Sequence, residues 1–263
     1  MANPYAPPGF DDGGFVPPRG GGSTGTPQPW EVGEVFKIAW EIIKRQPILV
    51  VVVFGVYLVS NLPGSAVNIL QALRLVEPDS PAFIIVGVVG TFVGLALGLF
   101  LQIGQLRMFV AAARGQQVDF GLLLSGADRF FPLVGMTFLT GFAVILGLLA
   151  CVVGAFVVGL GLMLAQYYLI DAGQGPIEAM KTSWRVTKGN LLNLFLFGLV
   201  GGALMMAGIC VLCVGMFVGM AIFMAGLAVI YLRSTGETVV VGAPPPAAGT
   251  PPQAPAYSPQ GMG

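Results

Sequence analysis

The chain contains no histidine, and only 9% of its 263 residues are charged. Without histidine it lacks the commonest general acid–base group and the commonest metal ligand of proteins. We therefore expect no metal site and no cofactor. Soluble domains carry about 25% charged residues, so the composition argues against a water-soluble fold. The 12 basic and 12 acidic residues cancel, and without a net field we expect no nucleic-acid partner.

Cysteine is scarce as well. The three cysteines, Cys151, Cys210 and Cys213, all lie in apolar sequence, which gives no disulfide framework. Cys210 and Cys213 form a C-x-x-C pair, but a redox pair needs a water-accessible thiolate. We interpret them as small packing residues. The N-terminal sequence has no apolar run of the secretory type, so we expect no signal peptide.

Long runs without a charged residue are the main feature of the sequence. Residues 132–170 and 191–232 contain no charged side chain, and each run is about twice the ~20 residues that a helix needs to cross a bilayer. The mean hydropathy of the whole chain is +0.86. These features predict an all-α fold, a polytopic bundle of about six transmembrane helices. The expected spans lie near 48–73, 82–113, 132–150, 153–171, 191–209 and 213–233.

The last four spans form two hairpins, with expected turns near Cys151 and within 208–214. The sequence leaves open whether these hairpins cross the membrane fully or re-enter on the same side. Pro63 should kink or shorten the first span. The second span is longer than the hydrocarbon core is thick, so its last turns should project beyond the bilayer.

Pro- and Gly-rich tails flank this membrane domain of residues 30–233. We expect residues 1–29 and 234–263 to be disordered, because neither tail has enough apolar area to offset the entropy of ordering. A polyproline-type ligand for a partner is the alternative role of such a tail. Of the 12 basic residues, only Arg74 falls on the side opposite the tails. This asymmetry predicts a bacterial inner-membrane protein with both termini in the cytoplasm.

An amphipathic segment precedes each hairpin. The first, 30–46, carries charges every three or four residues and the aromatic anchors Trp30 and Trp40. The last runs from Pro176 to Gly189, and the middle one, 118–131, has a weaker pattern with Asp119 as a candidate cap. The pattern predicts interfacial helices with the apolar face in lipid. Three such units could form an internal repeat, although any helix that leads into a membrane looks similar.

Two sets of polar residues are candidates for binding. The first is expected at an anionic lipid surface and comprises Lys181, Arg185, Lys188, Trp184 and Arg129. Topological anchoring explains these basic residues equally well. The second set lies at membrane depth and comprises Gln102, Gln105 and Arg107. These residues could line a cavity for a lipid headgroup, or they could form hydrogen bonds between helices, with Arg107 at the cytoplasmic boundary.

Glycines recur four residues apart at three places: Gly90, Gly94 and Gly98; Gly198 and Gly202; Gly215 and Gly219. This spacing puts them on one helix face, where a second helix can approach closely. We expect packing within the monomer, with a homo-oligomer seam as the alternative.

The most specific stretch is 167–199, YYLIDAGQGPIEAMKTSWRVTKGNLLNLFLFGL. It resembles a bacterial membrane family related to the membrane domain of glycerophosphoryl diester phosphodiesterases. The matching positions are Asp171, Ile177, Glu178, Ala179, Lys181, Ser183, Trp184, Thr187 and Gly189, with an upstream match at Gly115, Phe120, Leu123, Gly126, Arg129, Phe130 and Pro132. The family's Pro-Gly between the third and fourth spans is missing here, and so is the catalytic domain. The resemblance covers about 30–233 and implies a membrane module in a lipid environment, without hydrolysis.

The sequence thus favours a non-enzymatic membrane protein that interacts with anionic lipid on the cytoplasmic leaflet, or that serves as a scaffold for a membrane-protein partner or a second copy. A transporter or channel subunit for a neutral or lipidic solute is the first alternative, because neither uncharged run holds an ionisable group. A membrane-embedded lipid-processing enzyme is the weakest alternative, because the chain has no histidine and no clustered acidic pair in the membrane. Asp171 and Glu178 are close in sequence, but they fit a helix boundary and a first helical turn better.

Overall fold

The computed structural model describes residues 28–73, 80–150, 152–210 and 214–240. In these residues every regular element is a helix, and five helices are long and apolar enough to cross a membrane. The expectation of an all-α membrane bundle is therefore confirmed. The elements are α1 (Val32–Arg45), α2 (Ile48–Ala72), α3 (Pro81–Ala113), α4 (Phe120–Leu123), η1 (Ser125–Arg129), α5 (Phe130–Ala150), α6 (Val152–Gly161), α7 (Ala165–Ile170), α8 (Pro176–Thr187), α9 (Leu191–Cys210) and α10 (Val214–Ser234).

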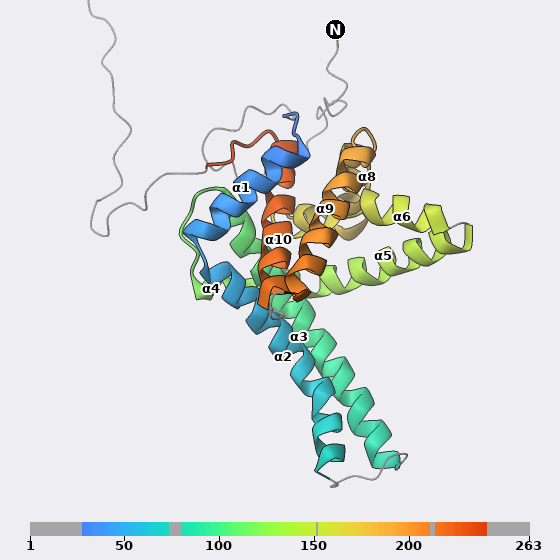
Figure 1. Ribbon diagram of the computed structural model, residues 1–263. Coiled ribbons are helices and arrows are strands. Elements are labelled where there is room, and N and C mark those ends of the chain that lie inside the picture. The colour runs from blue at the N-terminus through green and yellow to red at the C-terminus, as the bar shows by residue number, and fades with distance from the viewer. Residues whose placement is uncertain (1–27, 74–79, 151, 211–213, 241–263) are drawn as a thin grey trace, which may run out of the picture.

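Helices α2 and α3 form the longest hairpin, which extends away from the rest of the molecule (Figure 1). Ser80 caps α3 by accepting a hydrogen bond from the backbone N–H of Phe83, and Pro81 fits the first helical position because it has no N–H to satisfy. At about 1.5 Å per residue, the 33 residues of α3 reach about 50 Å. Pro63 lies inside α2 without ending it. The outer part of this hairpin has exposed apolar side chains, which suits contact with lipid.

Helices α5 and α6 form a second hairpin that leaves the body in another direction (Figure 1). The helices end and begin on either side of position 151. The span expected over 153–171 is not continuous, because α6 ends at Gly161 and α7 begins only at Ala165. By length, the apolar part Gly154–Ile170 falls short of the five long helices. Because the two hairpins point in different directions, they cannot both lie along one membrane normal.

Helices α9 and α10 form the centre of the body, and α1 crosses α10 (Figure 1). The apolar side chains of α1, among them Val35, Ala39 and Ile42, are buried, while its charged face is exposed. The ring of Phe36 stacks on Phe197 at 4.8 Å between centroids. The sequence-based expectation that lipid covers the apolar face of this helix is therefore wrong. Helix α10, together with α9, covers that face instead.

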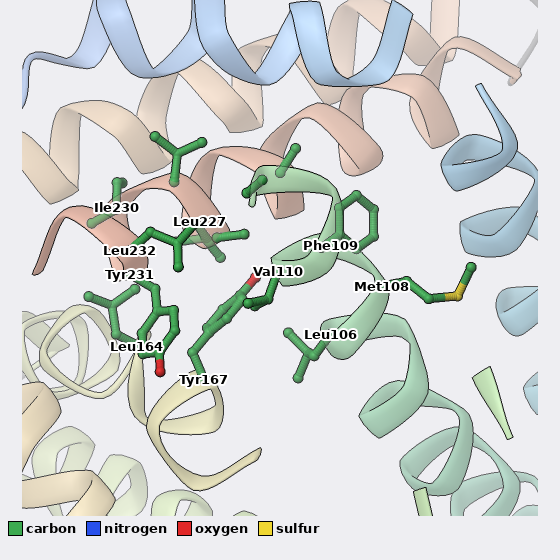
Figure 2. Packing of buried hydrophobic residues seen from close by; sticks show 14 of the residues in the cluster. Leu106, Met108, Phe109, Val110, Leu164, Tyr167, Leu227, Ile230, Tyr231 and Leu232 are labelled. Carbon is green, nitrogen blue, oxygen red and sulfur yellow. The ribbon is translucent and has the colours of Figure 1, made fainter. Parts of the chain in front are cut away.

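The core lies where α3, α7 and α10 meet beneath α1. Figure 2 shows Leu106 and Phe109 of α3, Tyr167 of α7, and Leu227 and Tyr231 of α10 packed together. Tyr167 stacks on Tyr231 at 5.6 Å, and its hydroxyl donates a hydrogen bond to the backbone oxygen of Met224. The polar ends of these rings are thus satisfied within an apolar core.

The middle amphipathic segment is not a helix comparable to α1 or α8. It consists of the four-residue α4 and the short 3-10 helix η1, and the Asp119 side chain makes no capping hydrogen bond. Both elements pack on α3, where a Cβ on Gly104 would overlap the Leu123 backbone. A close fit to α3 is found where a surface helix was expected, so the middle copy of the proposed repeat is not present in this form.

The C-terminal tail begins later than expected. After α10, the chain turns back over the end of α3, where the backbone N–H of Val240 donates to the backbone oxygen of Ala113. Glu237 in this segment is only 2% exposed. The expected tail boundary at residue 234 is therefore too early by at least seven residues, from Ser234 to Val240. The expectations for 1–27 and 241–263 concern residues outside the described part of the chain.

Candidate functional site

A groove runs along the α2/α3 hairpin and under α10. Glycines hold its two walls close together, because a Cβ on Gly90 would overlap the backbone oxygen of Pro63, and one on Gly94 would overlap that of Ser60. Gly98 lies against the Ser60 side chain. The expected glycine stripe of the second span thus packs within the monomer, between α2 and α3. Beside this contact the groove encloses about 720 Å³, a volume in the range of small-molecule sites.

The groove is lined by uncharged polar side chains at membrane depth. They are Ser60, Asn61, Ser65, Asn68, Thr91, Gln102 and Gln105, and apolar residues including Met220 and Met224 complete the wall. Gln102 donates to the side-chain oxygen of Gln166 at 2.8 Å, and Gln105 donates to the Met224 sulfur at 3.2 Å. Both glutamines therefore form hydrogen bonds to neighbouring helices, which is one of the two alternatives that the sequence left open. Both also line the groove.

Arg107 is not part of this groove. Its guanidinium donates two hydrogen bonds to Asp128, at 3.0 and 2.8 Å, and further bonds to the backbone and side-chain oxygens of Ser125. Arg129 donates to the backbone oxygen of Gly173 at 3.1 Å. The structure thus separates Arg107 from Gln102 and Gln105, and it places Arg129 beside Asp128 rather than beside the basic residues of α8.

A buried ion cluster joins the ends of α3, α7 and α10. Arg114 donates two hydrogen bonds of 2.7 Å to Asp171 and two, of 2.8 and 3.1 Å, to Glu237. The Tyr231 hydroxyl donates to Asp171 at 2.8 Å. The side chains of Arg114 and Asp171 are 17% and 16% exposed, and that of Glu237 is 3% exposed. Burial would lower the pKa of Arg114, but the hydrogen bonds to both carboxylates outweigh it and raise the pKa.

Sequence reasoning missed this cluster, because its three members lie far apart in the chain. A local signal exists, however. Each charged member lies within two residues of a glycine with positive φ: Gly115, Gly173 and Gly236. At each place the chain turns in the left-handed conformation that glycine adopts readily. An ionised residue beside such a glycine, at the end of a mostly apolar helix, marks where these helices converge.

Helix α8 presents a second surface, and its opposite face fixes it to the bundle. The hydroxyls of Ser183 and Thr187 donate to the backbone oxygen of Gly161, at 2.7 and 3.1 Å. Gly161 ends α6, so its carbonyl lacks a helical partner, and side-chain hydroxyls can satisfy such freed groups in a membrane. The Trp184 ring lies so close that a Cβ on Gly161 would overlap it. These residues therefore stabilise the break between α6 and α7.

The exposed face of α8 carries three cations and one carboxylate, that of Glu178 in the first turn. Lys181, Arg185 and Lys188 are exposed and form no ion pair or side-chain hydrogen bond with the described residues. In the same part of the chain, the only other basic residue without an ion pair is Lys37. Ile177 on the same helix is 60% exposed, and Trp184 is 36% exposed. The α8 surface thus combines unpaired cations with apolar side chains.

The remaining glycines behave differently from those of α3. Gly215 lies against the backbone of Gly208, and Gly219 lies against that of Met205, so both pack within the α9/α10 hairpin. A Cβ added to Gly198 or Gly202 would meet no atom within 4 Å, and the Phe223 ring lies against Gly201 instead. The prediction that Gly198 and Gly202 pack within the monomer is therefore wrong.

The described residues contain no group of three or more acidic residues or cysteines placed to hold a metal ion. The side chains of Cys151, Cys210 and Cys213 lie outside the described part. No family model matches the chain, and comparisons with curated proteins and with solved structures also give no match. The site must therefore be interpreted from its own geometry.

Proposed function

We propose that this chain is a non-enzymatic inner-membrane protein that binds anionic phospholipid through the basic face of α8. The observation that carries the proposal is the concentration of unpaired cations on one helix. Four basic residues make no ion pair in the described chain, and three of them are Lys181, Arg185 and Lys188. The other described basic residues are neutralised by Glu34, Glu41, Asp128, Asp171 or Glu237.

The position and neighbours of α8 suit a lipid surface. The helix lies at the same end of the molecule as α1 and the C-terminal end of α10 (Figure 1), where the apolar spans give way to polar sequence. Each basic side chain near an anionic leaflet contributes about 1 kcal/mol. Exposed Ile177 and Trp184 can enter the interface beside them, as aromatic and aliphatic anchors do.

The expected topology, with both termini in the cytoplasm, supports this proposal, because that side carries the anionic leaflet. The resemblance of residues 167–199 to a family whose members are expected in a lipid environment agrees with the proposal. In this structure the Ser183, Trp184 and Thr187 positions of that resemblance hold α8 against Gly161. They would thus fix the angle at which the basic face meets lipid.

The test compares two charge-matched variants in detergent micelles that contain phosphatidylglycerol. One replaces Lys181, Arg185 and Lys188 with alanine. The control replaces Lys37, Lys44 and Arg45 of α1 with alanine, which removes the same charge from the same end of the molecule. At about 1 kcal/mol per residue, the α8 variant should bind phosphatidylglycerol roughly 100-fold more weakly, while the α1 variant should change little.

Equal affinity in the wild type and the α8 variant would contradict the proposal. Equal weakening in both variants would also contradict it, because general charge rather than the α8 surface would then govern binding. Labelling of cysteines introduced at residues 2 and 260 checks that the orientation in the membrane is unchanged. Labels on opposite faces of the membrane would contradict the expected topology.

A further inference from the structure

The α2/α3 groove holds hydrogen-bond acceptors that the protein itself does not use. The hydroxyl of Ser60 donates to the Val56 backbone oxygen at 2.7 Å, and that of Thr91 donates to the Gly87 backbone oxygen at 2.8 Å. Ser65 likewise donates to Leu62. A hydroxyl that donates to its own helix keeps lone pairs that can accept. These side chains therefore present acceptors to the groove.

The glutamines at the inner end add stronger acceptors. Gln105 is 4% exposed, and its amide nitrogen donates only to the Met224 sulfur, a weak acceptor. Gln102 uses its amide nitrogen for Gln166. Neither side-chain oxygen accepts a hydrogen bond from the described residues. Both oxygens are therefore open to the groove rather than sealed in the core. An amide oxygen without a partner costs free energy in an apolar environment, so a ligand that supplies donors would be stabilised here.

The charges around the groove restrict the ligand further. Among the described residues no ionised side chain lines it, and the nearby Arg107 is occupied by Asp128 and Ser125. A phosphate would bring a negative charge to a groove whose described lining holds no cation. A bare ammonium would enter membrane depth without a carboxylate. Both are disfavoured relative to an uncharged group that carries hydroxyl donors.

The walls indicate that the rest of the ligand is apolar. The groove lies within the long apolar helices α2, α3 and α10, and its lining includes Val53, Leu95 and Met220. A third transmembrane helix is the competing occupant. Close helix approach usually depends on small residues, and here Gly90, Gly94 and Gly98 are already in contact with α2.

We propose that the α2/α3 groove binds one uncharged lipid with free hydroxyls on its headgroup, of the monoacylglycerol type. The hydroxyls donate to the side-chain oxygens of Gln102 and Gln105 at the inner end, and the acyl chain lies along the apolar wall toward the open end. This site is separate from the α8 surface and does not depend on the binding of anionic phospholipid there.

The experiment measures binding of two probes that share one acyl chain. Monooleoylglycerol has two free hydroxyls, and methyl oleate has none. The purified protein is equilibrated with each in lauryldimethylamine oxide, a detergent that offers no hydroxyl donors, and bound probe is quantified by native mass spectrometry. Monooleoylglycerol should bind at least tenfold more tightly than methyl oleate, and phosphatidylglycerol should not displace it.

Three variants locate the site. Gln105→Leu removes the inner acceptor, and Asn61→Leu changes the exposed part of the groove, where the side chain bonds only to the Tyr57 backbone oxygen of its own helix. Gln71→Leu is the matched control, because Gln71 is exposed on the same helix as Asn61 but does not line the groove. We expect about tenfold weaker binding of monooleoylglycerol in Gln105→Leu and no change in Gln71→Leu. Binding should be tighter in Asn61→Leu, because the acyl chain then meets an apolar side chain.

Equal binding of monooleoylglycerol and methyl oleate would overturn the proposal, as would equal losses in all three variants. If Gln105→Leu does not yield folded protein, Asn61→Leu decides: unchanged binding in that variant also overturns it. Cysteine cross-links between two copies at position 61, not competed by monooleoylglycerol, would show that a second chain occupies the groove instead. Displacement by phosphatidylglycerol would assign the groove to anionic lipid.

Discussion

The hairpins α2/α3 and α9/α10 are equally apolar, yet they have opposite roles in the fold. The apolar 18-residue stretch of α3 has a mean hydropathy of 2.6 and that of α10 has 2.2, but 11% of the first stretch and 67% of the second is buried inside the protein. Helix α10 is the centre of the core, whereas the outer half of α3 faces the membrane. Hydropathy identifies the helices that belong in the membrane, but it does not show whether lipid or other helices surround each of them.

Glycines show the same contrast. Spacing of four residues occurs in α3, α9 and α10. The spaced glycines of α3 and α10 contact the partner helix of their hairpin, but Gly198 and Gly202 of α9 do not. In α9 the contact shifts to Gly201, against the ring of Phe223, and to Gly208, against Gly215. A bulky ring at the α10 surface moves the close approach by one residue on one helix. Glycine spacing alone therefore predicts a close contact between two helices only where the facing helix has no bulky side chain at that level.

The largest effect should follow loss of Arg114, which joins the ends of α3 and α10. Arg114→Met leaves Asp171 and Glu237 buried without a cation, and breaking a buried ion pair in this way costs roughly 3–5 kcal/mol. We expect a loss of this size in the free energy of unfolding, measured by denaturant titration in mixed micelles. Arg107→Met is the control and should cost less, because its partner Asp128 is 56% exposed.

A second variant separates charge from packing at this cluster. Adding Asp171→Asn and Glu237→Gln to Arg114→Met removes the two uncompensated carboxylates. Much of the lost stability should return if unpaired charge causes the loss. If the neutral triple variant is as unstable as Arg114→Met, the cluster acts through its shape and its hydrogen bonds instead.

An intermediate effect is expected for Gly94 in the α2/α3 hairpin. Gly94→Ala places a Cβ on top of the backbone oxygen of Ser60, so the two helices must move apart. Overpacking of this kind costs about 1–3 kcal/mol. Gly198→Ala in α9 meets open space and should be close to neutral. Unfolding measurements that rank the two variants in reverse order would refute the assigned contacts.

Much of this arrangement could be predicted from the sequence. The uncharged runs predict membrane helices because hydrocarbon excludes ionised side chains. The charge pattern of 30–46 and the Pro176–Gly189 boundaries predict α1 and α8, because periodic charges and end signals are local properties. The membrane depth of Gln102 and Gln105 also follows from position in a span.

The remainder depends on contacts between distant segments. Nothing local in 30–46 shows that α10 rather than lipid covers its apolar face, since both are apolar. Similarly, the break at Gly161 depends on Ser183 and Thr187, whose hydroxyls donate to it from 22 and 26 residues away. Glu237 looks like a tail residue because the sequence around it is polar, and only the position of Arg114 explains its burial.

The smallest expected effect concerns the contact between α1 and α10. Glu34 pairs with Arg233, and the hydrogen bond from Arg233 holds the pKa of Glu34 below its ordinary value of 4.5. A carboxyl with a lowered pKa in the folded state contributes stability above the unfolded pKa, and that contribution is lost as the pH falls below about 4.5. Because the Glu34 side chain is 50% exposed, we expect only a few tenths of a kcal/mol.

Glu34→Gln should therefore flatten the fall in stability between about pH 5 and pH 3, measured by unfolding titrations or by hydrogen exchange of the α1 amides. Glu41→Gln is the comparison. The pKa of Glu41 is also lowered, chiefly by a hydrogen bond from Lys44, but both partners lie on α1, so this pair does not tie α1 to α10. If α1 amides of both variants show the same pH dependence, the Glu34–Arg233 pair does not hold α1 on α10, and apolar packing alone accounts for the contact.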